Sequence, residues 1–327
     1  MKIGDMIAPR LAYGEALAEL VKQNDRVVVL DADVGTSTFT SKVRETKPEN
    51  FYQVGIAEQN MFGIAAGMST LGLIPFATTF AVFASKRAAD QVSISIAYPK
   101  LNVKIGGAYG GIPTGKAGAT HQALEDIAIM RAMPNMTILV PADAVETKKA
   151  VFAAAEYEGP VYIRTVRCNV PVIFPENHKF EIGKSVLLRD GKDVTIISTG
   201  MMTPKAKVAG EILAKKGVDA RVLHIHTIKP IDIKAIVKAA KETSGIITVE
   251  NHSIIGGLGG AVAEVLCEHH PAKLIRLGMP DTFGESGDDE KIFSKYKMNT
   301  ENIVEAAIKF KNLNTKTPRK TQSSQRR

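Results

Sequence analysis

Apolar residues along the chain fall into short continuous runs and into longer stretches with helical spacing. Continuous runs predict buried strands at residues 26–31, 102–106, 136–140 and 161–165. Apolar residues at helical intervals predict helices at residues 11–23, 58–71, 84–97, 122–132 and 142–157. Strands that alternate with helices are typical of a parallel sheet covered by helices on both faces.

The pattern is interrupted by a stretch rich in proline and turn residues, and a second series of elements follows it. Strands are predicted at residues 193–198, 220–225, 245–250 and 273–277, with helices at 204–216, 233–241 and 257–268. We therefore expect an α/β protein of two domains, each a mostly parallel sheet with helices on both faces. The expected domains span residues 1–172 and 188–311, with a linker at 173–187.

Composition adds few constraints. A length of 327 residues fits two domains of about 150 residues each. No apolar run reaches the roughly 18 residues of a membrane span, and the N-terminus lacks a signal-like stretch, so we expect no membrane partner. Two cysteines, Cys168 and Cys267, are too few for a disulfide framework or a four-cysteine metal site. They predict reduced thiols and a cytoplasmic protein.

The net charge of +8 is concentrated at the C-terminus. Residues 312–327 contain five basic residues and no acid, together with proline, serine, threonine and glutamine. This composition predicts a disordered, solvated tail. The remaining body is only weakly basic, so we expect no nucleic-acid partner.

Glu58 opens the first segment with candidate chemistry, residues 52–67 (YQVGIAEQNMFGIAAG). An acid in the first turn of a helix complements the helix dipole, which by itself explains Glu58 structurally. The small residues that follow predict close packing against another element.

Two further segments carry aromatic residues and glycines. Residues 78–91 place Phe80 and Phe83 where a strand leads into a helix, and both also suit an ordinary core. Nine of the seventeen residues at 106–122 are Gly or Ala, and they surround Tyr109 and His121. Such a loop can hold phosphate with backbone N–H groups, although it is not a P-loop. His121 at a helix start also suits a cap or a surface position.

Taken in order, these segments resemble a known family. GIAEQ at 55–59, TTF at 78–80, GATHQ at 118–122 and PNMTILVPAD at 134–143 resemble the pyrimidine-binding domain of transketolase and of 1-deoxyxylulose-5-phosphate synthase. IKPID at 228–232 and ENHSIIGGLGG at 250–260 resemble the C-terminal domain of the same superfamily. The resemblance extends to about Phe310, and it implies an enzyme that uses thiamine diphosphate.

The resemblance also implies roles for individual residues at the cofactor. Glu58 matches the glutamate that hydrogen-bonds the pyrimidine nitrogen of thiamine diphosphate and supports its imino tautomer. Phe83 matches the aromatic residue that stacks on the pyrimidine, and Phe80 matches a neighbouring pocket aromatic. Val34 lies where the family places an apolar residue under the bent cofactor. His121 matches a histidine that hydrogen-bonds the hydroxyl groups of the donor sugar.

Substrate recognition follows from the same resemblance. Arg10, Ser37 and Arg167 resemble the two arginines and the serine that hold a sugar phosphate in transketolase, although both arginines also suit the surface. Tyr109 takes the position of a second phosphate-side histidine. Arg87 resembles an arginine of the synthase. The acid that the family places four residues before the histidine is Ala117 here, which leaves the sugar specificity open.

The Gly-Asp-Gly motif that holds Mg²⁺ and the diphosphate in this superfamily does not occur in the sequence. We therefore expect Mg²⁺ or Ca²⁺ to be held by a partner chain, an N-terminal-section subunit with Gly-Asp-Gly and a downstream Asn, and we expect no metal ligands here. The prediction is the C-terminal subunit of a split transketolase, a heterotetramer that also contains a contact between two copies of this chain. It would transfer a two-carbon unit between sugar phosphates in the pentose phosphate pathway.

Three alternatives remain open. A synthase of the deoxyxylulose type is favoured by GIAEQ and Arg87. The β subunit of the first component of a 2-oxoacid dehydrogenase shares the two-domain plan, but its substrates carry no phosphate for Arg10 and Arg167. A regulatory pairing module without activity is consistent with Ala117, whereas Glu58 and His121 argue against it.

Overall fold

The computed structural model describes residues 1–315. Helix α11 (Thr300–Thr315) extends beyond residue 311, so the backbone at 312–315 is helical and the expected tail does not begin at residue 312. The other residues of that tail, 316–327, lie outside the described residues. Within residues 1–315, no helix combines the length and the apolarity that a membrane span requires.

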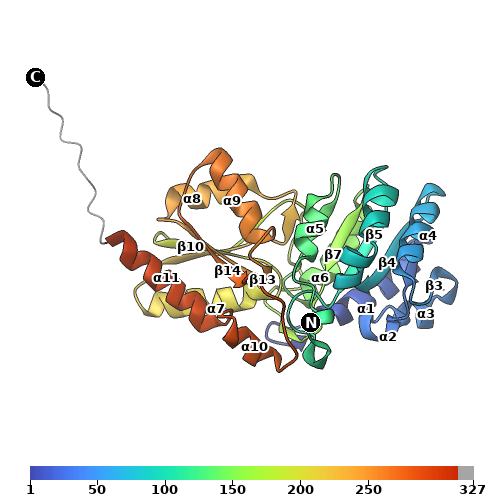
Figure 1. The fold of residues 1–327 in the computed structure, drawn as a ribbon, viewed down its shortest axis with the longest axis horizontal. Helices are drawn as coiled ribbons and strands as arrows, with labels where there is room; N and C mark the ends of the chain where they lie inside the picture. The colour runs from blue at the N-terminus through green and yellow to red at the C-terminus, as the bar shows by residue number, and fades with distance from the viewer. Residues whose placement is uncertain (316–327) are drawn as a thin grey trace, which may run out of the picture.

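The first sheet has seven strands in the order β12-β6-β7-β5-β4-β2-β3. Figure 1 labels β7, β5, β4 and β3 of this sheet. Their bounds are β2 (Val27–Asp31), β3 (Phe51–Gln53), β4 (Ile74–Phe80), β5 (Lys104–Ala108), β6 (Thr137–Leu139), β7 (Val161–Arg164) and β12 (Thr227–Lys229). Neighbouring strands are parallel except at β12, which pairs antiparallel with β6. Strands β2, β4, β5 and β7 are buried along their whole length. Apolar runs predicted β2, β5 and β7, whereas only the end of β4, near Phe80, was predicted.

Helices cover both faces of this sheet. The longer ones are α1 (Pro9–Gln23), α4 (Glu58–Thr70), α5 (Asp126–Ala132) and α6 (Ala144–Glu156). The shorter helical segments are α2 (Gly35–Thr38), α3 (Ser41–Thr46), η1 (Pro48–Asn50), η2 (Phe83–Arg87), η3 (Gln91–Ala97) and η4 (Gly115–Thr120). Successive residues of β2 point to opposite faces of the sheet. Val27 belongs to the same apolar cluster as Leu17 of α1, whereas Val28 belongs to the cluster that contains Phe62 of α4.

The predicted helix at residues 84–97 is not a continuous α-helix. The structure has two π-helical segments there, η2 and η3, which are separated at residues 88–90. The Ser85 hydroxyl donates to the Ala81 carbonyl at 2.7 Å, so a side chain competes with the backbone for this acceptor. Wide turns of this kind often occur at functional sites.

The second sheet has the order β14-β13-β10-β11-β9, and only β9 is antiparallel. Its strands are β9 (Val186–Arg189), β10 (Val194–Ser198), β11 (Ala220–His224), β13 (Ile246–Ser253) and β14 (Leu274–Met279). The helices of this half are α7 (Met202–Lys215), α8 (Ile233–Glu242), α9 (Leu258–His269), α10 (Asp289–Lys295) and α11. The expected fold of two mostly parallel, helix-covered sheets is confirmed.

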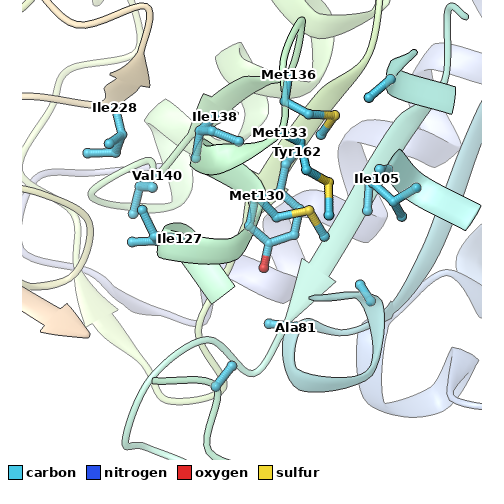
Figure 2. Close-up of a cluster of buried hydrophobic side chains, with 14 of the residues drawn as sticks. Ala81, Ile105, Ile127, Met130, Met133, Met136, Ile138, Val140, Tyr162 and Ile228 are labelled. Atoms are coloured by element: carbon cyan, nitrogen blue, oxygen red, sulfur yellow. The ribbon is translucent and has the colours of Figure 1, made fainter. Parts of the chain in front are cut away.

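The two halves of the chain are connected by more than the linker. Strand β12 belongs to the second half of the sequence but adds an edge to the first sheet, which the apolar pattern does not predict. A two-stranded ribbon of β1 (Met6–Ile7) and β8 (Val170–Pro171) closes the first half. One apolar cluster continues from the methionines around Tyr162 to Ile228 (Figure 2) and on to Val262 of α9.

Candidate active site

The predicted site residues gather at one edge of the first sheet. Strands β2, β4, β5 and β7 are parallel neighbours, so their carboxyl ends meet at the same edge. Val34 and Ser37 follow β2, Phe83 follows β4 and Arg167 follows β7. Open parallel sheets bind ligands at this edge, because the loops there converge above the strand ends.

Glu58 is the first residue of α4, and its side chain is 2% exposed. Both carboxylate oxygens accept from Nη1 of Arg87, at 2.9 and 3.0 Å. The Arg87 guanidinium lies over the Phe83 ring, with Cζ 4.1 Å from the ring centre. Since the Arg87 side chain is 48% exposed, a planar N–H donor reaches the buried carboxylate from the solvent side.

Aromatic rings form the wall beside this pair. The ring centres of Phe80 and Phe83 are 5.8 Å apart, and the Tyr109 ring lies 4.3 Å from Phe80. His121 meets Phe80 and Phe83 edge-on, at 5.9 and 5.5 Å. The Thr120 hydroxyl lies 2.9 Å from Nδ1 of His121. The structure thus brings His121 from the Gly-rich loop onto the aromatic residues that follow β4.

Two arginines and a serine meet on the other side of Tyr109. Nε of Arg10 donates to the Arg167 carbonyl at 3.0 Å, and Nη1 of Arg10 donates to the Ser37 carbonyl. The guanidinium carbons of Arg10 and Arg167 lie 5.3 and 5.9 Å from the Tyr109 ring centre. Burial lowers the pKa of Arg10, and the charge of Arg167 lowers it further. An anion between the two guanidinium groups would relieve this repulsion.

Asp31 organises the loop that carries Val34 and Ser37, and it was not among the predicted site residues. Its carboxylate accepts from the Val34 N–H at 2.7 Å and from the Thr40 hydroxyl at 2.7 Å. Burial raises its pKa. The sequence feature that could have identified Asp31 is an acid at the end of an apolar strand, VVVLD. Val34 packs against the same apolar cluster as Phe80.

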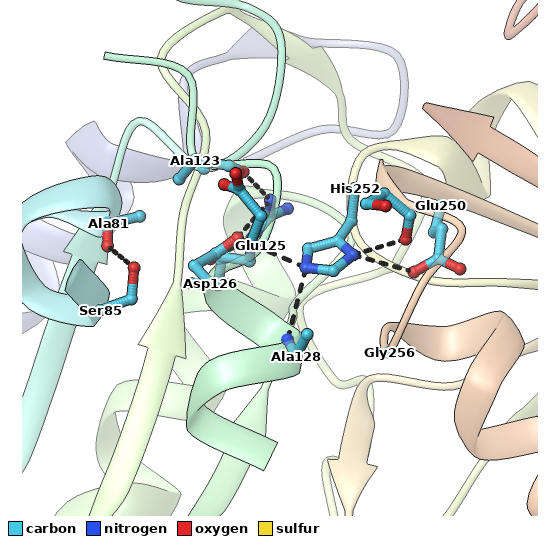
Figure 3. A network of polar contacts seen from close by, with 12 residues as sticks. Ala81, Ser85, Ala123, Glu125, Asp126, Ala128, Glu250, His252 and Gly256 are labelled. Carbon is cyan, nitrogen blue, oxygen red and sulfur yellow. Dashed lines mark hydrogen bonds and ion pairs between the residues drawn. The ribbon is translucent and has the colours of Figure 1, made fainter. Parts of the chain in front are cut away.

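A network of buried polar side chains, which includes Asp126, His252 and Glu250, lies next to the start of the Gly-rich loop (Figure 3). Nε of Arg164 donates to Asp126 at 2.7 Å, and Nη2 of Arg164 donates to the Asn251 carbonyl at 3.0 Å. His252 lies between the carboxylates of Asp126 and Glu250, at 4.0 and 3.6 Å, and burial lowers its pKa to about 4. Burial raises the pKa of Glu250 to about 7, although this carboxylate caps α9. The network joins β7 to β13 of the second sheet.

The side chains gathered at this site suit a ligand that has a planar nitrogen heterocycle next to an anionic group. A buried carboxylate beside an aromatic face can bind a ring with N–H donors, as the Arg87 guanidinium already does. Among the described residues there is no group of three or more His, Cys, Asp or Glu side chains that could hold a metal ion. The proposal that a partner chain holds the metal therefore rests on the sequence resemblance.

Comparisons with known proteins identify the family of the chain. The family model of the transketolase pyrimidine-binding domain matches residues 5–172, and that of the transketolase C-terminal domain matches residues 183–303. A Methanocaldococcus jannaschii protein, provisionally named a transketolase C-terminal section, is 48% identical over 298 residues. That alignment covers 90% of this chain and 93% of the relative.

The names of two other relatives mention two different substrates. A 6-deoxy-6-sulfo-D-fructose transketolase subunit of a Clostridium species is 43% identical, and the alignment covers 91% of this chain and 92% of the relative. One of the subunits of an apulose-4-phosphate transketolase of Phocaeicola vulgatus is 41% identical, with 94% of this chain and 98% of the relative covered.

Among solved structures, a split-gene transketolase described as an inactive β4 tetramer superposes with a TM-score of 0.88 at 49% identity. The match covers 94% of this chain and 99% of that one. With two domain models in the expected order and relatives matched along nearly their whole length, this chain belongs to the transketolase family.

Proposed function

We propose that this chain is the C-terminal subunit of a split transketolase, which transfers a two-carbon ketol unit between sugar phosphates. The observation that carries the proposal is the buried Glu58 carboxylate, bound by a planar group that stacks on Phe83. The anion-binding residues Arg10 and Arg167 lie on the other side of the same aromatic wall. Thiamine diphosphate, bound between this chain and an N-terminal-section partner, would supply the carbon nucleophile and the electron sink.

Each site residue then has a task that suits its position. Glu58 holds and returns a proton at the pyrimidine nitrogen, and its burial keeps water away from this exchange. Phe83 and Phe80 would hold the pyrimidine side of the cofactor by stacking, and Val34 would provide an apolar contact to it. His121 hydrogen-bonds the hydroxyl groups of the donor sugar. Mg²⁺ or Ca²⁺ and the diphosphate are held by the Gly-Asp-Gly motif of the partner.

Arg10, Arg167 and Ser37 bind the terminal anion of the sugar, and the Tyr109 ring lies close to both guanidinium groups. Guanidinium groups bind the oxygens of a phosphate in pairs, and a sulfonate presents the same kind of oxygens. The relatives that act on a sulfosugar and on a sugar phosphate are consistent with this chemistry. These residues favour a transketolase over an enzyme of simple 2-oxoacids.

The proposal is tested by reconstitution. We expect the purified chain alone to show no ketol transfer and only weak binding of thiamine diphosphate in calorimetry. A mixture with a chain that carries Gly-Asp-Gly and the downstream Asn should transfer a two-carbon unit from a ketose phosphate or a sulfoketose. Micromolar cofactor binding by the isolated chain would contradict the shared site, and no transfer from any donor would contradict the activity.

A matched pair of variants tests the role of Glu58. Glu58→Gln keeps the side-chain shape but cannot exchange the proton, so turnover of the assembled enzyme should fall about 10²–10⁴-fold. Glu301→Gln removes an exposed acid from the first turn of α11 and should leave turnover unchanged. Hydrogen–deuterium exchange at the reactive carbon of the cofactor reports the proton step directly. Normal exchange together with a lower melting temperature would reduce Glu58 to a helix-dipole residue.

A further inference from the structure

The second domain lies directly against the loop that carries His121. This loop, residues 110–121, follows β5 of the first sheet, and its outer side is covered by residues 284–289, which lead into α10. The buried amide nitrogen of Gln122 donates at 3.0 Å both to the Ile112 carbonyl and to the Glu285 carbonyl. One side chain thus joins the base of the loop to the covering segment.

Two more contacts hold the middle of the loop. The Ser286 hydroxyl donates to the Lys116 carbonyl at 3.2 Å, and the Gly115 N–H donates to the Asp289 carboxylate at 3.3 Å. The fit is close, because a Cβ on Gly118 would collide with the Ser286 hydroxyl oxygen. Asp289 also faces Arg167, whose charge acts to lower the pKa of this carboxylate, although burial outweighs that effect and raises it.

The middle of the loop, residues 115–120, has few means of its own to keep this conformation. Gly115 and Gly118 both have positive φ, and the side chains of Lys116, Ala117 and Ala119 are exposed. Such a segment loses much conformational entropy when it is ordered and gains little from its own packing. The contacts from residues 284–289 therefore contribute directly to its order. His121 ends this turn, with its N–H bonded to the Gly118 carbonyl at 3.0 Å.

We propose that residues 284–289 of the second domain are a positioning segment for substrate, with Ser286 and Asp289 as its positioning residues. They act through the loop at 110–121 and set the place of His121 against Phe83. Neither residue touches the reacting atoms. This assigns the second domain a part in substrate binding, and it rests on the proposed function, which gives His121 and Arg167 their sugar and phosphate partners.

Kinetics of the reconstituted enzyme test the proposal. Each lost hydrogen bond is expected to raise KM for the donor sugar about three- to tenfold in Ser286→Ala and in Asp289→Ala. Binding of thiamine diphosphate and assembly with the partner should stay unchanged, because Glu58 and Phe83 lie on other elements. Ser286→Thr keeps the hydroxyl and should restore KM. Ser294→Ala, on the exposed side of α10, is the matched control.

Hydrogen exchange on the isolated chain provides a measurement that does not depend on activity. Amide exchange at residues 114–121 should be about three- to tenfold faster in Ser286→Ala and in Asp289→Ala than in the wild type. Faster exchange with unchanged KM would overturn the positioning role, and unchanged exchange would overturn the contact itself. Absence of turnover in the wild-type mixture would instead overturn the proposed function, and the role in substrate binding with it.

Discussion

Tyr109 shows at the scale of single residues how the chain prepares an anion site. Its φ of 61° is in the left-handed region, which a bulky side chain rarely adopts. This backbone turns the ring between Phe80 and the two guanidinium groups of Arg10 and Arg167. Local strain of this kind persists where the surrounding structure enforces it and is frequent at functional sites.

Arg167→Ala should raise KM for phosphorylated donors by about 10- to 100-fold, because a hydrogen bond to a charged group is worth roughly 1.5–3 kcal/mol. KM for a non-phosphorylated donor should change little. Initial-rate kinetics of the assembled enzyme with both donors make the comparison. The exposed Arg44→Ala on α3 is the control for loss of charge. Equal losses with both donors would remove Arg167 from the phosphate site.

At the scale of elements, the start of α6 is a junction between the two domains. Asp143 caps this helix and also accepts from the N–H groups of Ile173 and Phe174 in the linker. One turn further along, the buried Glu146 carboxylate lies 2.8 Å from Nε2 of His224, at the end of β11. Helix, linker and second sheet therefore meet at buried polar groups, which cost free energy when their partners change charge.

His226 makes this junction sensitive to pH. Burial lowers its pKa to about 4, and His224 and His178 lower it further, while Glu146 and Asp232 act in the opposite direction. In the unfolded chain, His226 has the ordinary histidine pKa of about 6.5. Between about pH 6.5 and 4, the unfolded chain therefore binds more protons at this residue than the folded chain does. Stability from this group is present above about pH 6.5 and is lost as the pH falls through that window.

His226→Asn should therefore lose less stability than the wild type between about pH 7.5 and 4.5. The difference in the free energy of unfolding is on the order of 3 kcal/mol at most. Melting temperatures across this range measure it, and the exposed His269→Asn, on α9, is the control. Parallel pH profiles for the wild type and His226→Asn would contradict the assignment.

At the scale of the whole molecule, large apolar side chains are exposed at both ends of α4 and at the end of η3. Leu71, Tyr98 and Ile56 are 82%, 79% and 75% exposed. On α4 itself, Gly63 and Gly67 are exposed, and a Cβ at either position would meet nothing within 4 Å. Glycine inside a helix costs roughly 0.5–1 kcal/mol relative to alanine. Since neither glycine serves packing within the described part of this chain, we expect another chain to approach here.

Gly67→Leu should leave the isolated fold intact and weaken association with another chain. Gly67→Ala should raise the melting temperature of the unassociated chain, because alanine favours the helix. Analytical ultracentrifugation of this chain alone and with the N-terminal-section partner gives the association constants, and circular dichroism checks the fold. Ala214→Leu, at an exposed position of α7, is the control for an added leucine. Unchanged association of Gly67→Leu in both samples would exclude this face as an interface.

Most of the elements could be predicted because their signals are local. The apolar run at residues 26–31 becomes β2 (Val27–Asp31), and the helical pattern at 11–23 becomes α1 (Pro9–Gln23). Strands β9 and β12 were not predicted, because each is short and lies at a sheet edge. The segment expected as a helix at residues 84–97 is helical, but most of it has π-helical bonding, which the apolar spacing does not distinguish from an α-helix.

The sequence by itself determined the α/β class, the order of the motifs and the family, because periodicity and short motifs are properties of neighbouring residues. It also provided Glu58, His121, Arg10 and Arg167 as candidates, although their roles came from resemblance. The resemblance also grouped Arg10 with Arg167, and the tertiary structure shows their contact across 157 positions of the chain. Only the tertiary structure decided that the second domain covers the Gly-rich loop. Such contacts depend on sheet order and on packing between domains, which local patterns do not encode.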